Sequence, residues 1–245
     1  MNWHSRYTQQ ASWTHDLRAY LFERTGLKSA GRFLEVGCGT GAVLSGIVSS
    51  ASSHGLDIQF ASLEDTRLNA PSAILVQGDA LSLPYADECF DIVFCHFLLL
   101  WVADPLGAVL EMNRVASPGG NILALAEPDY SARLDRPEAL SVLGKWQAQA
   151  LQRQGADPSL GGKLADLFFR AGVEIVETGT IQRSGEAALT PAERELEWSV
   201  LEADLAGIVP DSELKKMKAL DEGAWAAGER ELYVPTYFAW GRKEV

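Results

Sequence analysis

The segment RFLEVGCGTGAVL, from Arg32 to Leu44, places three glycines within five residues between two apolar stretches. The short apolar run before the glycines predicts a strand, and the run after them predicts a helix over 40–51. A loop without side chains at the carboxyl end of a strand lets backbone N–H groups approach a ligand closely. The segment therefore predicts a strand–loop–helix unit of an α/β fold, with a binding site at the loop.

The rest of the chain continues this alternation of strands and helices. Short β-branched or aromatic runs closed by Gly, Asp or Pro predict seven strands, at 32–36, 53–58, 73–77, 90–96, 121–127, 173–183 and 233–241. Helical patterns lie between most of them, at 13–25, 40–51, 61–68, 104–116, 137–154 and 161–171, the last closed by Gly172. The alternation predicts one domain over 1–245 with a mainly parallel sheet and helices on both faces.

About fifty residues separate the last two predicted strands, where a tight turn would suffice. The sequence TPAE predicts a capping box of Thr190 and Glu193 around Pro191, and hence a helix start. A second helix should follow Asp211, with Leu214, Met217 and Leu220 on one stripe. The alternatives stay open: a cap that selects a ligand, or two helices that merely extend the core or form a homodimer contact.

Composition narrows the classes of partner. The 33 acidic and 21 basic residues give a net charge of -12, which repels polyphosphates and argues against nucleic acid. Cys38, Cys89 and Cys95 have neither disulfide nor metal-ligand spacing, so no metal is expected. The polar start MNWHSRYTQQ and the short apolar run FLLLWVA at 97–103 predict a cytoplasmic protein that is not inserted in a membrane.

The glycine loop alone is compatible with two ligands. Gly37, Gly39 and Ala42 satisfy a permissive dinucleotide-binding pattern, and Asp57 lies about twenty residues further on, as a ribose-binding acid should. Glu35 favours a different ligand, because an ionisable group at this strand end could meet a cationic head group. An NAD-dependent oxidoreductase would leave Glu35 and the acidic motif VQGDA at 76–80 without roles.

The motifs LEVGCGTG, GLDI, QGDALSLPYADECFDIVFCHFLLLWVADP and NRVASPGG together resemble the class I S-adenosylmethionine-dependent methyltransferases, specifically the small-molecule branch that includes ubiquinone and menaquinone biosynthesis enzymes. The resemblance covers about 30–130 closely. It implies a Rossmann-like seven-stranded sheet with an antiparallel last strand, and S-adenosyl-L-methionine as the cofactor. It also implies that 31–130 form the cofactor-binding half, preceded by an N-terminal lid segment over 1–30.

The same resemblance assigns individual residues. The loop that wraps the methionine part of the cofactor corresponds to Glu35, Gly37, Cys38, Gly39 and Gly41. Asp57 and the adjacent Ile58 correspond to the ribose site, Asp79 and Ala80 to the adenine site, and His96 to the space between cofactor and acceptor. Each has a simpler interpretation: glycines of a tight turn, Asp57 and Asp79 as helix N-caps, and His96 as a hydrogen-bonded core residue.

The remaining assignments concern the acceptor. If the acceptor must lose a proton, the candidate bases above the strand ends are His96, Glu127 and Asp129, the last two with a solvated turn as the alternative. In related enzymes the N-terminal segment covers the cofactor, so Tyr7 and Trp13 are candidate lid residues. With cap insertions at 131–158 and 184–232, it would close a pocket lined by four aromatic side chains, Trp146, Trp198, Trp225 and Tyr233.

The sequence therefore predicts methyl transfer from S-adenosylmethionine to a small, aromatic or apolar acceptor. Because a chain can keep a cofactor-binding fold without turnover, a non-catalytic regulator or partner protein is the alternative.

Overall fold

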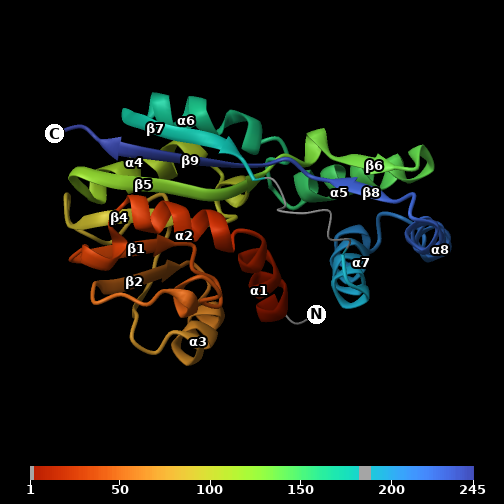
Figure 1. The fold of residues 1–245 in the computed structure, drawn as a ribbon, viewed down its shortest axis with the longest axis horizontal. Coiled ribbons are helices and arrows are strands. Elements are labelled where there is room, and N and C mark those ends of the chain that lie inside the picture. Colours follow the sequence, from red (N-terminus) through yellow and green to blue (C-terminus); the bar gives the residue numbers. More distant parts are fainter. Residues whose placement is uncertain (1–2, 182–188) are drawn as a thin grey trace.

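The computed structural model describes residues 3–181 and 189–245 and contains a seven-stranded sheet with strand order β3-β2-β1-β4-β5-β9-β7 (Figure 1). The strands are β1 (Arg32–Val36), β2 (Ser52–Asp57), β3 (Ile74–Gln77), β4 (Phe90–Cys95), β5 (Ala116–Pro128), β7 (Val173–Thr180) and β9 (Thr236–Lys243). Strand β9 lies between β5 and β7 and runs antiparallel to both. The predicted Rossmann-like sheet with an antiparallel last strand is confirmed.

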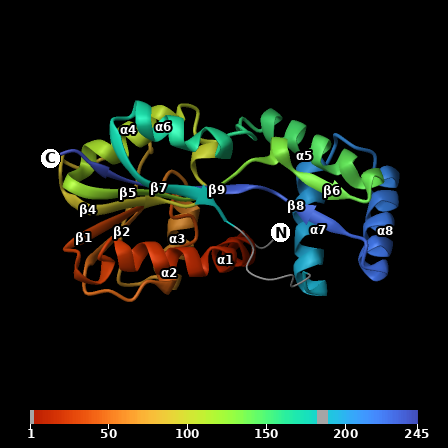
Figure 2. The ribbon, with the colours of Figure 1, turned by 45° about the horizontal axis from the view of Figure 1, so that its top comes forward.

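Both faces of the sheet are buried, because successive side chains along each strand enter different apolar clusters. In β1, Leu34 and Val36 pack in one cluster and Phe33 in the other. Helices α4 (Pro105–Val115) and α6 (Leu164–Arg170) cover the first face, and α1 (Trp3–Trp13), α2 (His15–Arg24) and α3 (Phe60–Asn69) cover the second (Figure 2).

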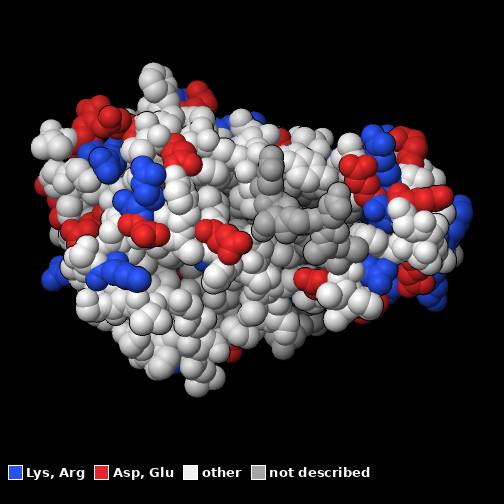
Figure 3. All heavy atoms as spheres, viewed as in Figure 1, with Lys and Arg blue, Asp and Glu red and all other residues white. Residues whose placement is uncertain are grey.

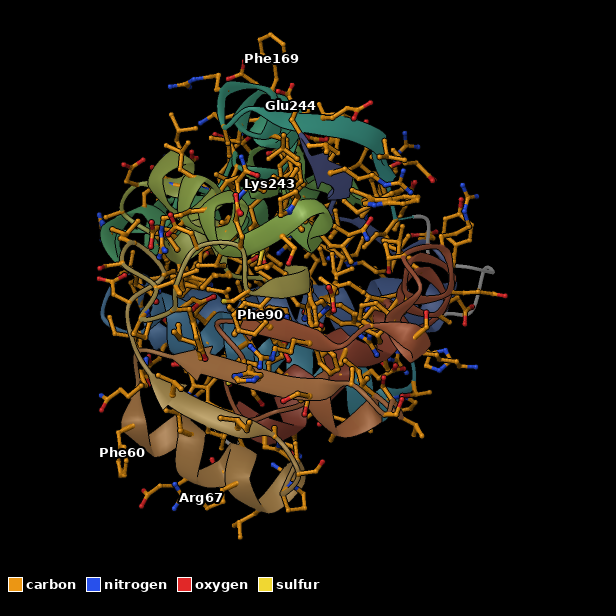
Figure 4. All side chains as sticks on the ribbon, turned by 90° about the vertical axis from the view of Figure 1, so that its left-hand side faces the viewer. Phe60, Arg67, Phe90, Phe169, Lys243 and Glu244 are labelled. Atoms are coloured by element: carbon orange, nitrogen blue, oxygen red, sulfur yellow. The ribbon has the colours of Figure 1, made fainter. Side chains whose placement is uncertain are left out.

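The view from the end of the sheet shows the same layers. Phe60 and Arg67 point outward from α3 on one side, Phe169 points outward from α6 on the other, and Phe90 lies between them in the sheet (Figure 4). Phe90 is 1% exposed, whereas Phe169 is 75% exposed. The two aromatic residues thus mark the inside and the outside of one three-layer unit.

The helix predicted over 40–51 is wrong. The glycine loop is followed by a single 3-10 turn, Leu44–Gly46, after which Ile47 is extended. Gly46 disfavours continuation of a helix, and the Ser49 hydroxyl instead donates to the Leu27 carbonyl at 3.0 Å.

At the N-terminus, two helices replace the one predicted over 13–25. The two helices are separated by Thr14, whose φ of −105° and ψ of 6° differ from those of an α-helix. The predicted stop at Gly172 is confirmed, since its φ is +70° and its N–H donates to the Phe169 carbonyl at 3.1 Å.

A helical cap stands beside the carboxyl ends of the parallel strands. It contains α5 (Ser141–Arg153), α7 (Pro191–Leu205), α8 (Asp211–Ala227) and a two-stranded sheet that was not predicted, β6 (Leu134–Arg136) with β8 (Glu231–Tyr233) (Figures 1 and 2). The capping box of Thr190 and Glu193 is confirmed. On α8, Leu214 and Met217 are buried as predicted, but Leu220 is 37% exposed.

The cap has an apolar core of its own, formed by side chains from α5, α7, α8 and their flanks. The end of the strand predicted over 173–183 and the start of the cap predicted over 184–232 fall on 182–188, outside the described residues.

On the face seen in Figure 3, basic and acidic side chains are interspersed at both ends of the molecule. Over 3–181 and 189–245, no helix has both the length and the apolar character needed to cross a bilayer. The cytoplasmic location and the homodimer stay predictions.

Candidate active site

A cavity of about 850 Å³ lies where the carboxyl ends of β1, β2 and β4 meet α1 and the cap. Most of the residues predicted to bind the cofactor line it: Tyr7, Glu35, Gly37, Cys38, Gly39, Asp57, Ile58, Asp79, Ala80 and His96. Ligands of open α/β sheets bind at this edge, because the strands end there and the connecting loops diverge.

Gly39 and Gly41 of the loop are glycines for different structural reasons. Gly39 lines the cavity with a φ of +52°, and a Cβ there would lie 3.3 Å from the Tyr7 ring. Gly41, with a φ of +77°, is not among the lining residues; its Cβ would lie 2.9 Å from Cγ2 of Thr66 on α3. Glycine at 41 is therefore explained by the backbone conformation and by packing against α3.

Asp57 connects the end of β2 to the glycine loop. Its carboxylate accepts hydrogen bonds from the Gly39 N–H at 2.8 Å and the Gln59 N–H at 2.9 Å. The residue at the N-cap of α3 is Gln59, so the helix-cap interpretation of Asp57 is wrong. Asp79, at the end of the next strand, accepts a bond from the Leu81 N–H at 2.9 Å. Both carboxylates keep lone pairs for a ligand in the cavity that they line.

Glu35 is the most deeply buried acid of the loop region. It is 2% exposed, and its Oε2 has no hydrogen-bond partner within 3–181 and 189–245. Burial raises the pKa of Glu35 well above its ordinary value, and the positive charge of Arg18 opposes this shift. A buried carboxyl oxygen without a partner is costly, so a donor or cation from a ligand in the cavity would stabilise this arrangement.

His96 is held from the N-terminal side. Its Nε2 lies 2.9 Å from Oγ1 of Thr14, and the Arg18 guanidinium donates to the same hydroxyl oxygen at 2.6 Å. Burial, with a smaller contribution from Arg18, lowers the pKa of His96 to about 3. The imidazole is consequently neutral at physiological pH and is a weak base, although it lines the cavity as predicted.

Glu127, the other candidate base, does not line the cavity. It is fully buried, and its carboxylate accepts backbone N–H bonds from Leu98 at 3.0 Å, Leu99 at 3.0 Å and Leu100 at 3.2 Å. Leu98 and Leu100 themselves line the cavity. Because it reaches the cavity only through this turn, we assign Glu127 a positioning role in place of the predicted catalytic one.

Asp129 likewise belongs to a turn. It caps the 3-10 turn Tyr130–Ala132 through the Ser131 and Ala132 N–H groups.

We expect Glu127→Gln to change how stability depends on pH. Burial raises the pKa of Glu127 from 4.5 to about 7, so the folded state retains a proton that the unfolded chain releases. The wild-type protein should lose about 3 kcal/mol relative to Glu127→Gln as pH rises through this interval. Urea denaturation across the interval measures the difference, with Glu64→Gln on the exposed face of α3 as control. Parallel stability curves for wild type and Glu127→Gln would contradict the assigned ionisation.

Of the two predicted lid residues, Tyr7 and Trp13, only Tyr7 lines the cavity. Tyr7 lines the cavity, and burial followed by the charge of Asp57 raises its pKa. Trp13 is not among the lining residues; the Arg6 guanidinium lies 4.9 Å from the centre of its ring. The residues missed on α1 are Trp3, Arg6 and Gln10, which share the cavity with Tyr7. Their spacing of three and four residues is the available signal, because it places them on one helix face.

The four aromatic residues predicted to line the acceptor pocket, Trp146, Trp198, Trp225 and Tyr233, do not line the cavity at the strand ends. Trp198 and Trp225 instead line a separate pocket of about 30 Å³ within the cap. Trp198 belongs to the cap core, where its Nε1 donates to Asp221 at 2.8 Å. The aromatic side chains that line the cavity come mainly from α1 and the loops after β4 and β5: Trp3, Tyr7, Phe97, Trp101 and Tyr130. A small amphipathic cap must bury its own large side chains to be stable, which leaves fewer of them for the ligand.

Comparison with known proteins places this geometry in a family. A methyltransferase domain model matches residues 34–124. The demethylmenaquinone methyltransferase of Lysinibacillus sphaericus is 30% identical over 209 residues, an alignment covering 77% of this chain and 87% of that protein. An enzyme of the same name from Staphylococcus aureus is 34% identical over 126 residues. This alignment covers 49% of this chain and 51% of that protein, so the chain matches only about half of the length of this relative.

Solved structures share the fold at lower identity. A proposed sarcosine dimethylglycine methyltransferase from Galdieria sulphuraria has a TM-score of 0.60 and 19% identity, covering 94% of this chain and 84% of that chain. The [4+2]-cyclase SpnF has a TM-score of 0.61 and 24% identity, covering 94% of this chain and 80% of that one. The sheet order, the glycine loop at the end of β1 and the long match to a named relative lead to one assignment. The chain belongs to the class I S-adenosylmethionine-dependent methyltransferases.

Proposed function

We propose that this protein transfers a methyl group from S-adenosylmethionine to a small, aromatic or apolar acceptor bound in the same cavity. The observation that carries the proposal is the continuity of this cavity. One part is lined by the glycine loop and by Glu35, Asp57 and Asp79, and another by apolar and aromatic side chains such as Trp101 and Leu151.

The residues of the first part fit the proposed cofactor. The unpartnered Oε2 of Glu35 offers an acceptor to an ammonium group, and Gly39 leaves space beside the backbone of the loop. The carboxylate of Asp57 would accept bonds from ribose hydroxyls, and Asp79 with Ala80 would border the adenine. When bound, the sulfonium of S-adenosylmethionine supplies the electrophilic methyl group.

The chain's own contribution is alignment and exclusion of water. In-line displacement requires the acceptor atom to be held against the methyl group, and little covalent assistance is needed. Helix α1 closes one side of the cavity with Trp3 and Tyr7, while the turn held by Glu127 supplies Leu98 and Leu100. His96, neutral and held by Thr14, would contact the reactants without adding a charge.

The acceptor class follows from the cavity wall and from the named relatives. Aromatic and aliphatic side chains favour a ring-bearing acceptor. Because relatives are named demethylmenaquinone methyltransferases, a reduced quinone ring is the acceptor class that we propose to test.

The alternative is a protein that binds the cofactor without transferring its methyl group. It stays open because a named cyclase shares the fold at similar TM-score.

Calorimetry and product analysis test the proposal. We expect S-adenosylhomocysteine to bind with micromolar-range affinity and NADH not to bind. Incubation with S-adenosylmethionine and naphthohydroquinone should then release S-adenosylhomocysteine and methylated ring product. Binding without turnover on any ring-bearing acceptor would favour the non-catalytic alternative, and binding of NADH alone would overturn both.

A further inference from the structure

A polar cluster lies on the cap side of the cavity, away from the proposed cofactor half. It consists of Arg6 from α1, Tyr130 from the turn after β5, Gln154 after α5 and Asp204 near the end of α7, and all four line the cavity. Helices α1 and α7 face each other in both ribbon views (Figures 1 and 2). Segments far apart in the chain therefore bring four hydrogen-bonding groups to one wall.

Arg6 is already committed to protein partners. Its guanidinium is buried, donates to Gln9 at 2.7 Å, and pairs with Glu197 of α7. The same group lies over the Trp13 ring. Arg6 thus ties the N-terminal helix to the cap and leaves its positive charge largely neutralised.

Asp204 is less fully satisfied. Its two oxygens accept only amide N–H bonds, from Gln147 at 3.3 Å and Gln154 at 3.4 Å, both longer than usual for such bonds. Within the described residues no Lys, Arg or His forms an ion pair with it. Burial raises the pKa of Asp204, in part opposed by these two amides and by Arg6. A carboxylate has about four lone-pair positions, so this side chain keeps capacity for a ligand donor.

Tyr130 supplies a hydroxyl to the same cavity. In the described part of the chain, its hydroxyl has no hydrogen-bond partner, although its ring packs against the main core. Burial raises the pKa of Tyr130; the positive charge of Arg6 opposes this shift, and the negative charges of Glu197 and Asp204 add to it. The hydroxyl therefore stays protonated and can both donate and accept a hydrogen bond.

We propose that Tyr130 and Asp204 form the subsite that binds a ring hydroxyl of the acceptor, with Asp204 accepting the hydrogen bond from that hydroxyl. This inference rests on the proposed function and assigns a residue pair to it. The negative charge of Asp204 disfavours acceptors carrying a carboxylate or phosphate at this wall. A hydroxyl on an aromatic ring matches both this carboxylate, to which it donates, and the aromatic side chains that line the same cavity.

The test uses three probes of the same size class with the S-adenosylhomocysteine complex of the full chain. Naphthohydroquinone carries ring hydroxyls, its dimethyl ether lacks them, and naphthylmethylammonium carries a cation. Calorimetry should show the hydroquinone bound at least about tenfold more tightly than the ether, because a hydrogen bond to a charged acceptor is involved. Asp204→Leu should reduce this preference to about threefold or less, and Tyr130→Phe should reduce it partially.

The matched control is Glu202→Leu, which removes an exposed carboxylate of the same helix that pairs with Lys218. It should preserve the preference, and all three variants should bind S-adenosylhomocysteine within about threefold of wild type. An unchanged preference in Asp204→Leu, or tighter binding of the ammonium probe by wild type, overturns the subsite. Failure of all three probes to bind, while S-adenosylhomocysteine binds, instead overturns the ring-bearing acceptor of the proposed function and removes the basis of the subsite with it.

Discussion

Trp198→Ala is expected to lower the free energy of unfolding by about 3–5 kcal/mol and to leave cofactor binding intact. Trp198 is 6% exposed in the cap core, and its Nε1–H is bonded to Asp221, a buried residue that also pairs with Arg230. The substitution creates a cavity and removes one partner of a buried carboxylate, and both effects destabilise the folded state. Urea denaturation followed by circular dichroism measures the loss.

Trp225→Ala is the matched control for this substitution. Trp225 also lies in the cap, but it is only partly buried and stacks beneath the Arg194 guanidinium at 5.3 Å. Its removal should cost distinctly less than that of Trp198. S-adenosylhomocysteine affinity should stay within about threefold of wild type in both variants. A tenfold change in acceptor turnover at unchanged unfolding free energy would instead place Trp198 in the acceptor site.

Asp57→Ala is expected to weaken S-adenosylhomocysteine binding by at least about tenfold, and by more if both ribose hydroxyls are held. Each charge-assisted hydrogen bond contributes about 1.5–3 kcal/mol, and about 1.4 kcal/mol corresponds to one decade in affinity. The variant also removes the acceptor of the Gly39 N–H, which fixes the glycine loop toward the cavity. Calorimetry on the wild type and the variant measures the ratio of dissociation constants.

Asp91 offers a control of the same chemistry elsewhere in the sheet. Its carboxylate also accepts two backbone N–H bonds, from Gly31 at 2.6 Å and Arg32 at 3.0 Å, but near the start of β1 and away from the cavity. Asp91→Ala should affect stability and leave cofactor affinity within about threefold. Equal affinities for wild type and Asp57→Ala would limit Asp57 to a structural bond within the loop.

The strands were predictable because their signals are local. Phe33 and Leu34 of RFLEV enter different cores, and the side chains of 92–95 alternate between the two, as an internal parallel strand requires. The capping box at Thr190 and the stop at Gly172 likewise depend on residues within one turn. The segment 40–51 was mispredicted because a local apolar pattern competes with Gly46 and with a serine that bonds a distant carbonyl.

The residues of the proposed cofactor half were expected to lie together, for a related reason. In a parallel sheet, residues at or just after the carboxyl ends of adjacent strands come together at one edge whatever the intervening segments do. Glu35, Asp57 and Asp79 follow this rule, and all three line the cavity.

The acceptor half could not be derived in this way. Glu127 lies at the carboxyl end of β5, where a base is expected, yet the turn after β4 folds over it and uses its carboxylate for three N–H bonds. Trp198 is an aromatic residue of the type that often lines ligand pockets. It nevertheless packs in the core formed by α5, α7 and α8, whereas Asp204 of α7 lines the cavity.

By itself, then, the sequence determined the strand–helix order, the glycine loop and the acids at the strand ends, because backbone propensities and sheet geometry act over a few residues. Only the tertiary structure decided which polar groups remain free to meet an acceptor. That choice depends on burial and pairing between segments such as Arg6 and Glu197, which are 191 residues apart in the chain.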